Sequence, residues 1–335
     1  MRLMVCPERP IRPSLPKPDG PVFFPQTKIN SYLREHIIKR AGKENLVWAI
    51  GYGSQVGGDA GKRSMYDVMI IVDDVEKFHK RNLLLRPYDY GLPHSVKWHA
   101  LFNKFGFNFY HSHFMDGDVD RPLKLAVISM DNFIGGCNGT LFEGEKERNG
   151  AFGMYVAGRV QKAALSPLYR REDDSSAAIE SAINTARIDG IWYALGFLNN
   201  KFTYDEFVNA YVSLSYWADV RVEKRGKVKT LIRNNEKDYK EMLEPIVQAF
   251  ITNGLIKVEK EGFGWYEKNY SLSAAETQLR LLHLKKIAFL TNYFKLPITA
   301  GIAKGMVYAL LKIARVADSL PQIHGAAENI RHFFR

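Results

Sequence analysis

Two short stretches near the beginning of the chain carry residue types that can bind a nucleoside triphosphate and a metal ion. Trp48–Ser54 (WAIGYGS) is an apolar run that ends in a Gly-Ser pair, and Ser64–Asp74 (SMYDVMIIVDD) is an apolar run that contains one acid and ends in two more. Backbone N–H groups of a Gly-Ser turn can bind phosphate oxygens. Carboxylates can hold the Mg²⁺ that bridges those phosphates. The pair of stretches therefore predicts a nucleotidyltransferase-type site.

Asp67 is the first candidate for the metal ligand. It lies inside an otherwise apolar strand, where an ionised carboxylate is costly unless a metal ion or a cation meets it. The usual nucleotidyltransferase pattern has a second acid two residues later, on the same face of the strand, but Met69 occupies that position. Either Asp73 or Asp74 replaces it from the strand end, or an acid elsewhere does. Asp73 and Asp74 can equally cap the following helix.

The turn and the helix after the second strand supply four further candidates. Gly53 and Ser54 would hold the triphosphate through backbone amides and a hydroxyl, unless they form a plain turn. His79 and Asn82 are three residues apart and therefore share a helix face, so both can point into one pocket. There His79 would donate to a phosphate or act as a base. The alternative is an ordinary surface histidine.

Three cations further along the chain can bind phosphates. Lys124 lies in an apolar strand, where a lysine requires an anion. Arg159 and Lys162 are three residues apart and can clamp phosphates together, or form a solvated charge pair.

Asp219 and Arg221 follow Leu214–Ala218 in the second half of the chain. If the segment is extended, both lie on one face and can close the site from across a domain cleft. They can also pair with other surface charges.

Hydrophobic periodicity predicts an α+β fold that would position these residues. We expect a linker over 166–174 and a hairpin within 254–272, which together with the preceding helices suggests a winged-helix-like second domain. The domains would be 1–170 (nucleotidyltransferase), 175–272 (winged-helix-like) and 276–335 (C-terminal helical, membrane-binding). The other expected elements are helices 26–42, 176–198, 204–217 and 236–253, and strands 45–50, 66–72, 107–114 and 121–129.

The composition is that of a globular protein with an anionic partner. The 335 residues are 46% hydrophobic and carry a formal net charge of +11, which favours nucleic acid, nucleotide phosphates or an acidic membrane surface over neutral partners. Two cysteines form neither a metal-ligand cluster nor a disulfide framework and fit a reducing compartment. Met1–Gly20 has no apolar core of a secretory signal. No apolar run is long enough to predict a spanning helix.

The last stretch of the chain has the pattern of a helix that lies in a membrane interface. Over 298–316, apolar residues recur every three or four positions and cations lie between them. The alternative is an amphipathic helix packed on its own domain. The residues expected at the membrane are Ile302, Lys304, Met306, Leu310, Lys312 and Ile313.

Six short motifs, in this order, resemble one known family. The chain looks like a member of the mitochondrial-type CDP-diacylglycerol synthases, peripheral phosphatidate cytidylyltransferases linked by name to translocator assembly and maintenance. The likeness runs from residue 46 to 240 and more weakly to 310. The motifs are Tyr52–Ser54, Met65–Asp67 leading to Val72–Asp74, Phe78–Asn82, Leu123–Ser129, Tyr155–Lys162 and Leu214–Arg221.

The resemblance implies a polymerase-beta-like nucleotidyltransferase domain, a winged-helix-like domain and a C-terminal membrane-binding helix. It implies CTP and phosphatidic acid as substrates, Mg²⁺ as cofactor, and CDP-diacylglycerol and pyrophosphate as products, for phosphatidylglycerol and cardiolipin synthesis. The family motif also lacks an acid two residues after the strand aspartate. Its functional residues would fall on Gly53, Ser54, Asp67, His79, Asn82, Lys124, Arg159, Lys162, Asp219 and Arg221.

Location and partners follow from the same features. We expect a peripheral protein on an anionic membrane surface, at the cytoplasmic face of a bacterial cell membrane because no mitochondrial presequence pattern is visible, with the matrix side of the mitochondrial inner membrane as the alternative. No nucleic-acid partner is expected, although a nucleic-acid-directed nucleotidyltransferase is the alternative function. That function predicts a basic wing, whereas Lys257–Lys268 carries both signs. A non-catalytic winged-helix protein would leave Asp67 without a purpose.

Overall fold

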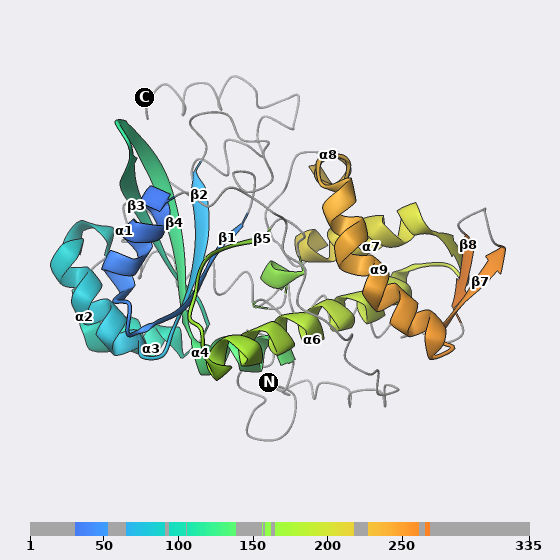
Figure 1. Ribbon diagram of the computed structural model, residues 1–335, viewed down its shortest axis with the longest axis horizontal. Helices are drawn as coiled ribbons and strands as arrows, with labels where there is room; N and C mark the ends of the chain where they lie inside the picture. Colours follow the sequence, from blue (N-terminus) through green and yellow to red (C-terminus); the bar gives the residue numbers. More distant parts are fainter. Residues whose placement is uncertain are drawn as a thin grey trace, which may run out of the picture.

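The computed structural model of the chain shows a mixed α+β fold with two β-sheets (Figure 1). A five-stranded sheet lies at one end of the molecule and a three-stranded sheet at the other, and one long helix runs between them. The structure describes residues 31–52, 65–90, 94–104, 106–138, 156, 158–161, 165–217, 227–260 and 265–268.

The five-stranded sheet has the strand order β3-β4-β2-β1-β5. Strands β2 and β4 are parallel and every other neighbouring pair is antiparallel. The strands are β1 (Leu46–Tyr52), β2 (Tyr66–Val72), β3 (Asn108–Asp116), β4 (Val119–Ser129) and β5 (Leu165–Arg170).

Helices cover both faces of this sheet because both faces are apolar. On β2, Val68 and Ile70 pack into the cluster that contains α1 and α2, which we call the α1 face. Met69 and Ile71 alternate with them and pack into the opposite cluster, which contains α4 and α6 and which we call the α4 face. The elements of the first half are α1 (Ser31–Ala41), α2 (Val75–Leu85), η1 (Pro87–Asp89), α3 (Val96–Asn103) and α4 (Met130–Asn138).

Helix α6 (Asp174–Phe197) belongs to two hydrophobic cores. Its first half contributes Ile179 and Ile183 to the α4 face of the sheet, and its second half contributes Ile191 and Leu195 to the core of the second half of the chain. A helix of 24 residues is about 36 Å long. Figure 1 shows it running from one sheet to the other.

The second half of the chain packs helices against a small antiparallel sheet with the order β6-β8-β7. The predicted hairpin is confirmed as the β7–β8 pair. The elements are β6 (Lys201–Thr203), α7 (Tyr204–Trp217), α8 (Lys227–Asn234), α9 (Glu236–Thr252), β7 (Ile256–Lys260) and β8 (Trp265–Lys268).

The predicted linker over 166–174 is wrong in its first half. Strand β5 occupies Leu165–Arg170 and pairs antiparallel with β1 at the edge of the sheet. An edge strand tolerates proline, so Pro167, which suggests a linker in the sequence, is compatible with this position. The expected C-terminal region 276–335, with its membrane-contacting residues, lies outside the described residues. Across the described ranges, no helix is both long enough and apolar enough to span a bilayer.

Candidate functional site

Asp67 and Lys124 face each other across the only parallel strand pair described in the large sheet. Asp67 is the second residue of β2, and the register of β2 and β4 places it opposite Lys124. The lysine Nζ lies 3.6 Å from the aspartate Oδ1. The aspartate side chain is 28% exposed and the lysine side chain 12%. Two residues expected to bind a cation and an anion therefore meet, and the pair still has access to solvent.

The neighbours of this pair lie in the same row of the sheet, on the α4 face. The Lys124 Nζ also lies over the ring of Phe109, 4.9 Å from its centroid, a cation–π contact that holds the ammonium at the sheet surface. On β3, His111 is the register partner of Lys124, and on β1, Tyr52 is the register partner of Asp67. The strand register thus adds His111, which none of the six motifs contains, and Tyr52, which begins the first of them.

A single carboxylate can serve a magnesium site whose other ligands come from substrate. The described residues contain no group of three or more His, Cys, Asp or Glu side chains that could hold a metal. Mg²⁺ is commonly bound through one or two carboxylates together with substrate phosphates and water. Asp67, half-buried and beside a cation, fits that kind of site. The predicted turn residues Gly53 and Ser54 follow β1 and lie outside the described residues.

Asp73 and Asp74 do not complete a metal site with Asp67. Six and seven residues separate them from it along β2 and its exit, which corresponds to about 20 Å at about 3.3 Å per residue. Ligands of one Mg²⁺ each lie about 2.0–2.1 Å from the ion. The prediction that these acids substitute for the missing one is therefore wrong.

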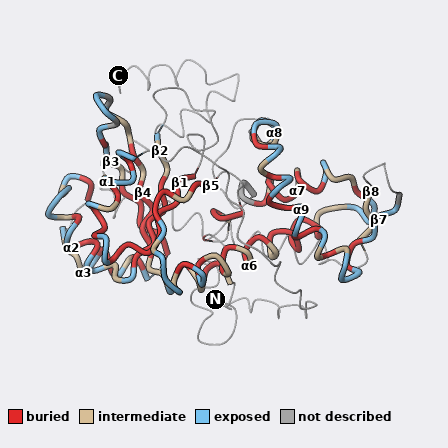
Figure 2. Tube along the Cα trace, viewed as in Figure 1, coloured by how far each residue is buried: buried red, intermediate tan, exposed pale blue. Residues whose placement is uncertain are grey.

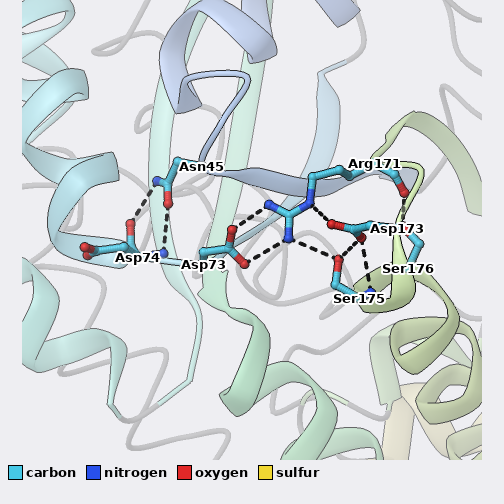
Figure 3. Close-up of polar contacts among 7 residues, drawn as sticks. All are labelled: Asn45, Asp73, Asp74, Arg171, Asp173, Ser175 and Ser176. Atoms are coloured by element: carbon cyan, nitrogen blue, oxygen red, sulfur yellow. Dashed lines mark hydrogen bonds and ion pairs between the residues drawn. The ribbon is translucent and has the colours of Figure 1, made fainter.

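Both acids have structural partners at that end of the sheet (Figure 3). Asp73 accepts hydrogen bonds of 2.5 and 3.2 Å from Nη1 and Nη2 of Arg171, the residue after β5. Asp74 caps α2, which is the alternative that the sequence left open, because its carboxylate accepts from the backbone N–H groups of Glu76 and Lys77 at 2.8 and 3.1 Å. The two acids join β2, β5 and α2.

His79 and Asn82 share one environment, as their spacing predicts, but it is a buried polar cluster and not an open pocket. Both side chains are fully buried. His79 Nε2 lies 2.7 Å from Asn103 Oδ1, and His79 Nδ1 lies 3.1 Å from the Tyr90 hydroxyl. The Asn82 amide donates to the same hydroxyl at 2.8 Å and accepts from Arg40 Nε at 2.8 Å. Neither side chain is exposed to solvent, so His79 is not the surface histidine of the alternative either.

The hydrogen-bond pattern engages both ring nitrogens of His79. Asn103 donates its amide to the Val127 carbonyl at 2.8 Å, so its Oδ1 must accept the proton of His79 Nε2. Nδ1 then accepts from Tyr90, whose pKa is raised by burial so that the hydroxyl keeps its proton. An imidazole with both nitrogens hydrogen-bonded to protein groups has no free nitrogen for proton transfer to a phosphate. We name the cluster of Arg40, His79, Asn82, Asp89, Tyr90, His99, Asn103 and Asn108 the buried network.

Arg159 is buried in the short helical segment 158–161, next to Val160 of the α4-face core. Its neighbour Gln161 donates to the Ala186 carbonyl of α6 at 3.1 Å, and Arg187 Nε donates to the Val160 carbonyl at 3.4 Å. Burial lowers the pKa of Arg187 to about 10. The segment is thus fixed to α6. The other predicted site residues here, Lys162, Asp219 and Arg221, lie outside the described residues.

Comparison with known proteins gives consistent matches. Residues 35–286 match the family described as "Phosphatidate cytidylyltransferase, mitochondrial". Relatives of that name from Caenorhabditis elegans and Caenorhabditis briggsae are each 24% identical over 215 residues, 61% of this chain and 61% of the relative. One from Schizosaccharomyces pombe is 27% identical over 220 residues, 60% of this chain and 49% of the relative. The alignments therefore span 49–61% of the length of these relatives, less than two thirds in each case.

The family match covers β1, β2 and β4 with Asp67 and Lys124, and it continues through α6 into the second half of the chain. The motif resemblance and the match thus rest on the same elements. This chain belongs to the mitochondrial phosphatidate cytidylyltransferase family.

Proposed function

We propose that this protein transfers the cytidylyl group of CTP to phosphatidic acid and releases CDP-diacylglycerol and pyrophosphate. The ion pair between Asp67 and Lys124 is the observation that carries the proposal. In this pair, a carboxylate that can bind a metal lies beside a cation that can bind phosphate. Asp67 is also the register partner of Tyr52, the last residue of the neighbouring strand β1. The Gly53-Ser54 turn follows β1 in the sequence, and the relatives are named for this activity.

In the proposed reaction, a phosphate oxygen of phosphatidic acid attacks the α-phosphorus of CTP. A new P–O bond forms, the bond to the β-phosphate oxygen breaks, and its electrons leave with pyrophosphate. Because the nucleophile is already anionic, no strong general base is needed, and positioning and charge neutralisation dominate. The loss of His79 from the set of candidate bases therefore does not weaken the proposal.

Asp67 and Lys124 would divide the charge neutralisation between them. Asp67 would hold Mg²⁺, which when bound supplies positive charge to the phosphates. Lys124, 3.6 Å away and supported by the ring of Phe109, would neutralise a phosphate oxygen of CTP or of the lipid. Gly53 and Ser54 would hold the β- and γ-phosphates. Arg159, Lys162, Asp219 and Arg221 remain proposed substrate contacts.

The architecture and location complete the proposal. The large sheet would form a polymerase-beta-like nucleotidyltransferase domain and the second half a winged-helix-like domain, with a membrane-binding region at 276–335. The β7–β8 hairpin carries Lys257 and Lys268 but also Glu259, which pairs with Lys201. This mixture of signs does not favour a nucleic-acid platform. The relatives' names agree with the mitochondrial alternative for the location and lend no support to a bacterial membrane.

A turnover assay tests the proposed function. The full chain is incubated with radiolabelled CTP, Mg²⁺ and phosphatidic acid, and the lipid phase is extracted and assayed for a labelled cytidine lipid. Formation of that lipid together with pyrophosphate is the expected result. Incorporation of label into RNA or DNA primers, with no lipid product, would replace the proposal with the nucleic-acid-directed alternative.

A further inference from the structure

The outer surface of α2, η1 and α3 exposes large apolar side chains that the proposed active site does not use. Leu84 is 81% exposed, Tyr88 88% and Trp98 51%. Leu85 and Leu101 are exposed as well, and we name these five residues the α2–α3 patch. Single exposed apolar residues are normal, but several on adjacent elements mark an interaction surface.

The elements of the patch are held next to one another from behind. The hydrogen bond between His79 of α2 and Asn103 of α3 connects the two helices. The ring of Tyr90, the residue after η1, lies with its centroid 4.7 Å from that of His99 and connects η1 to α3. The patch is therefore the outer side of a unit whose inner side is the buried network. Figure 2 shows exposed segments along α2 and α3 at the end of the molecule away from the three-stranded sheet.

The exposed charges in the patch elements are mainly positive. Between Val75 and Lys104, the described residues include six exposed cations and a single exposed acid, Glu76. The other acid in this stretch, Asp89, is buried and paired with Arg40 at 2.6 Å. The exposed cations are Lys77, Lys80, Arg81, Arg86, Lys97 and Lys104.

We propose that the α2–α3 patch docks the protein on an anionic lipid surface, as a membrane contact separate from the C-terminal region. Leucine, tryptophan and tyrosine among lysines and arginines are the composition of surfaces that insert into the headgroup region. Cations near an anionic bilayer each add favourable binding energy. The proposal rests on the proposed function only in that a lipid substrate brings the protein to a membrane.

Other partners fit these observations less well. A second copy of the chain would bring the same six cations against each other in a two-fold contact. Nucleic acid would use the cations and stack on Tyr88 and Trp98, but Leu84, Leu85 and Leu101 offer nothing to bases. Aliphatic side chains of this kind match acyl chains.

The patch lies on the layer that covers the α1 face, whereas Asp67 and Lys124 belong to the α4 face. Docking and chemistry therefore use different side chains. Removing the patch should weaken action on phosphatidate in vesicles but not on a short-chain phosphatidate that is dissolved as monomers.

The test uses the full chain with Leu84→Ser and Trp98→Ser together. The matched control, Met115→Ser with Val258→Ser, removes two exposed apolar residues from the β3 and β7 strands. Binding to phosphatidylcholine vesicles containing phosphatidylglycerol is measured by sedimentation. We expect about a tenfold loss for the patch variant and less than about a twofold loss for the control. Equal binding of the two variants would overturn the proposal.

The fluorescence of Trp98 reports membrane contact of the patch itself, independently of any contact made by the C-terminal region. Lipids brominated on the acyl chain quench tryptophan that lies in the bilayer, and the difference between the wild type and Trp98→Phe isolates this residue among five tryptophans. Quenching of Trp98 is expected. If Trp98 is not quenched in vesicle-bound protein, the proposal is wrong. It is also wrong if the Leu84→Ser, Trp98→Ser variant loses self-association but still binds vesicles. If no phosphatidate is turned over at all, the proposed function fails while the vesicle result still stands.

Discussion

Two of the polar clusters described at the large sheet differ in how completely the protein itself satisfies them. In the buried network, Arg40, His79, Asn82 and Asn103 bind one another and main-chain carbonyls, out of contact with solvent. At the other cluster, Asp67 and Lys124 lie 3.6 Å apart, and both side chains keep some exposure to solvent. A polar group already held by protein partners has little capacity left for a ligand. Candidate site residues are therefore better judged by spare hydrogen-bonding capacity than by residue type.

Arg40→Met has the largest expected effect and tests the structural role of the buried network. It leaves Asp89 buried without its cation, which should lower the free energy of unfolding by about 3–5 kcal/mol. Burial lowers the pKa of Arg40 and Asp89 raises it again, so the pair is interdependent. Chemical denaturation measures the change. The double variant Arg40→Met with Asp89→Leu should recover part of the loss, and an Arg40→Met single variant as stable as the wild type would contradict the structural role.

Asp67→Asn tests the pair of Asp67 and Lys124, which is the candidate active site. Turnover should fall by about 10²–10³-fold, since one preorganised electrostatic group is removed from the reaction. The unfolding midpoint should change little, because the Asp67 side chain is part-exposed and Lys124 keeps its cation–π contact with Phe109. Asp118→Asn, in the exposed turn between β3 and β4, is the matched control and should retain wild-type turnover. Full activity of Asp67→Asn would remove this residue from the site.

Tyr90→Phe has an intermediate effect on the buried network. The hydroxyl accepts from Asn82 and donates to His79, and its loss leaves two buried groups unpaired, at a cost of about 1–3 kcal/mol. Tyr88→Phe removes the same atom from an 88% exposed ring two residues away and should cost far less. Thermal unfolding of the Tyr90→Phe and Tyr88→Phe variants measures the two losses of stability. A drop in CTP affinity of folded Tyr90→Phe, without loss of stability, would connect the network to the site.

Asp73→Asn has the smallest expected effect and sharpens the boundary of the metal site. The ion pair with Arg171 is 40% and 25% exposed, so weakening it should cost only about 0.2–1 kcal/mol. The Mg²⁺ dependence of turnover should stay at the wild-type value, because Asp73 lies at the opposite end of β2 from Asp67. A shifted Mg²⁺ requirement would return Asp73 to the metal site.

Local sequence patterns predict the strands and the single residues of the candidate site, but not which of these residues meet. Asp67 and Lys124 were each recognisable as charges in apolar strands. Their contact depends on the parallel pairing of β2 with β4, and β3 intervenes in sequence between them. No local pattern encodes that pairing.

The error over His79 has a similar cause. The three-residue spacing correctly placed His79 and Asn82 on one face of α2, but the identity of that face is decided by Tyr90, Asn103 and Arg40, which come from other elements. The edge strand β5 was missed because Pro167 signals a break locally, while pairing with β1 stabilises an extended chain there.

The long helix α6 has a consequence for cooperativity. This one helix contributes Ile179 and Ile183 to one core and Ile191 and Leu195 to the other. If either core unfolds, the helix therefore loses apolar contacts on which the packing of the other core also depends. The two halves should therefore lose structure in one concerted transition. A chain cut just before Asp174 would leave the α4 face of the large sheet without the part of its cover that α6 supplies.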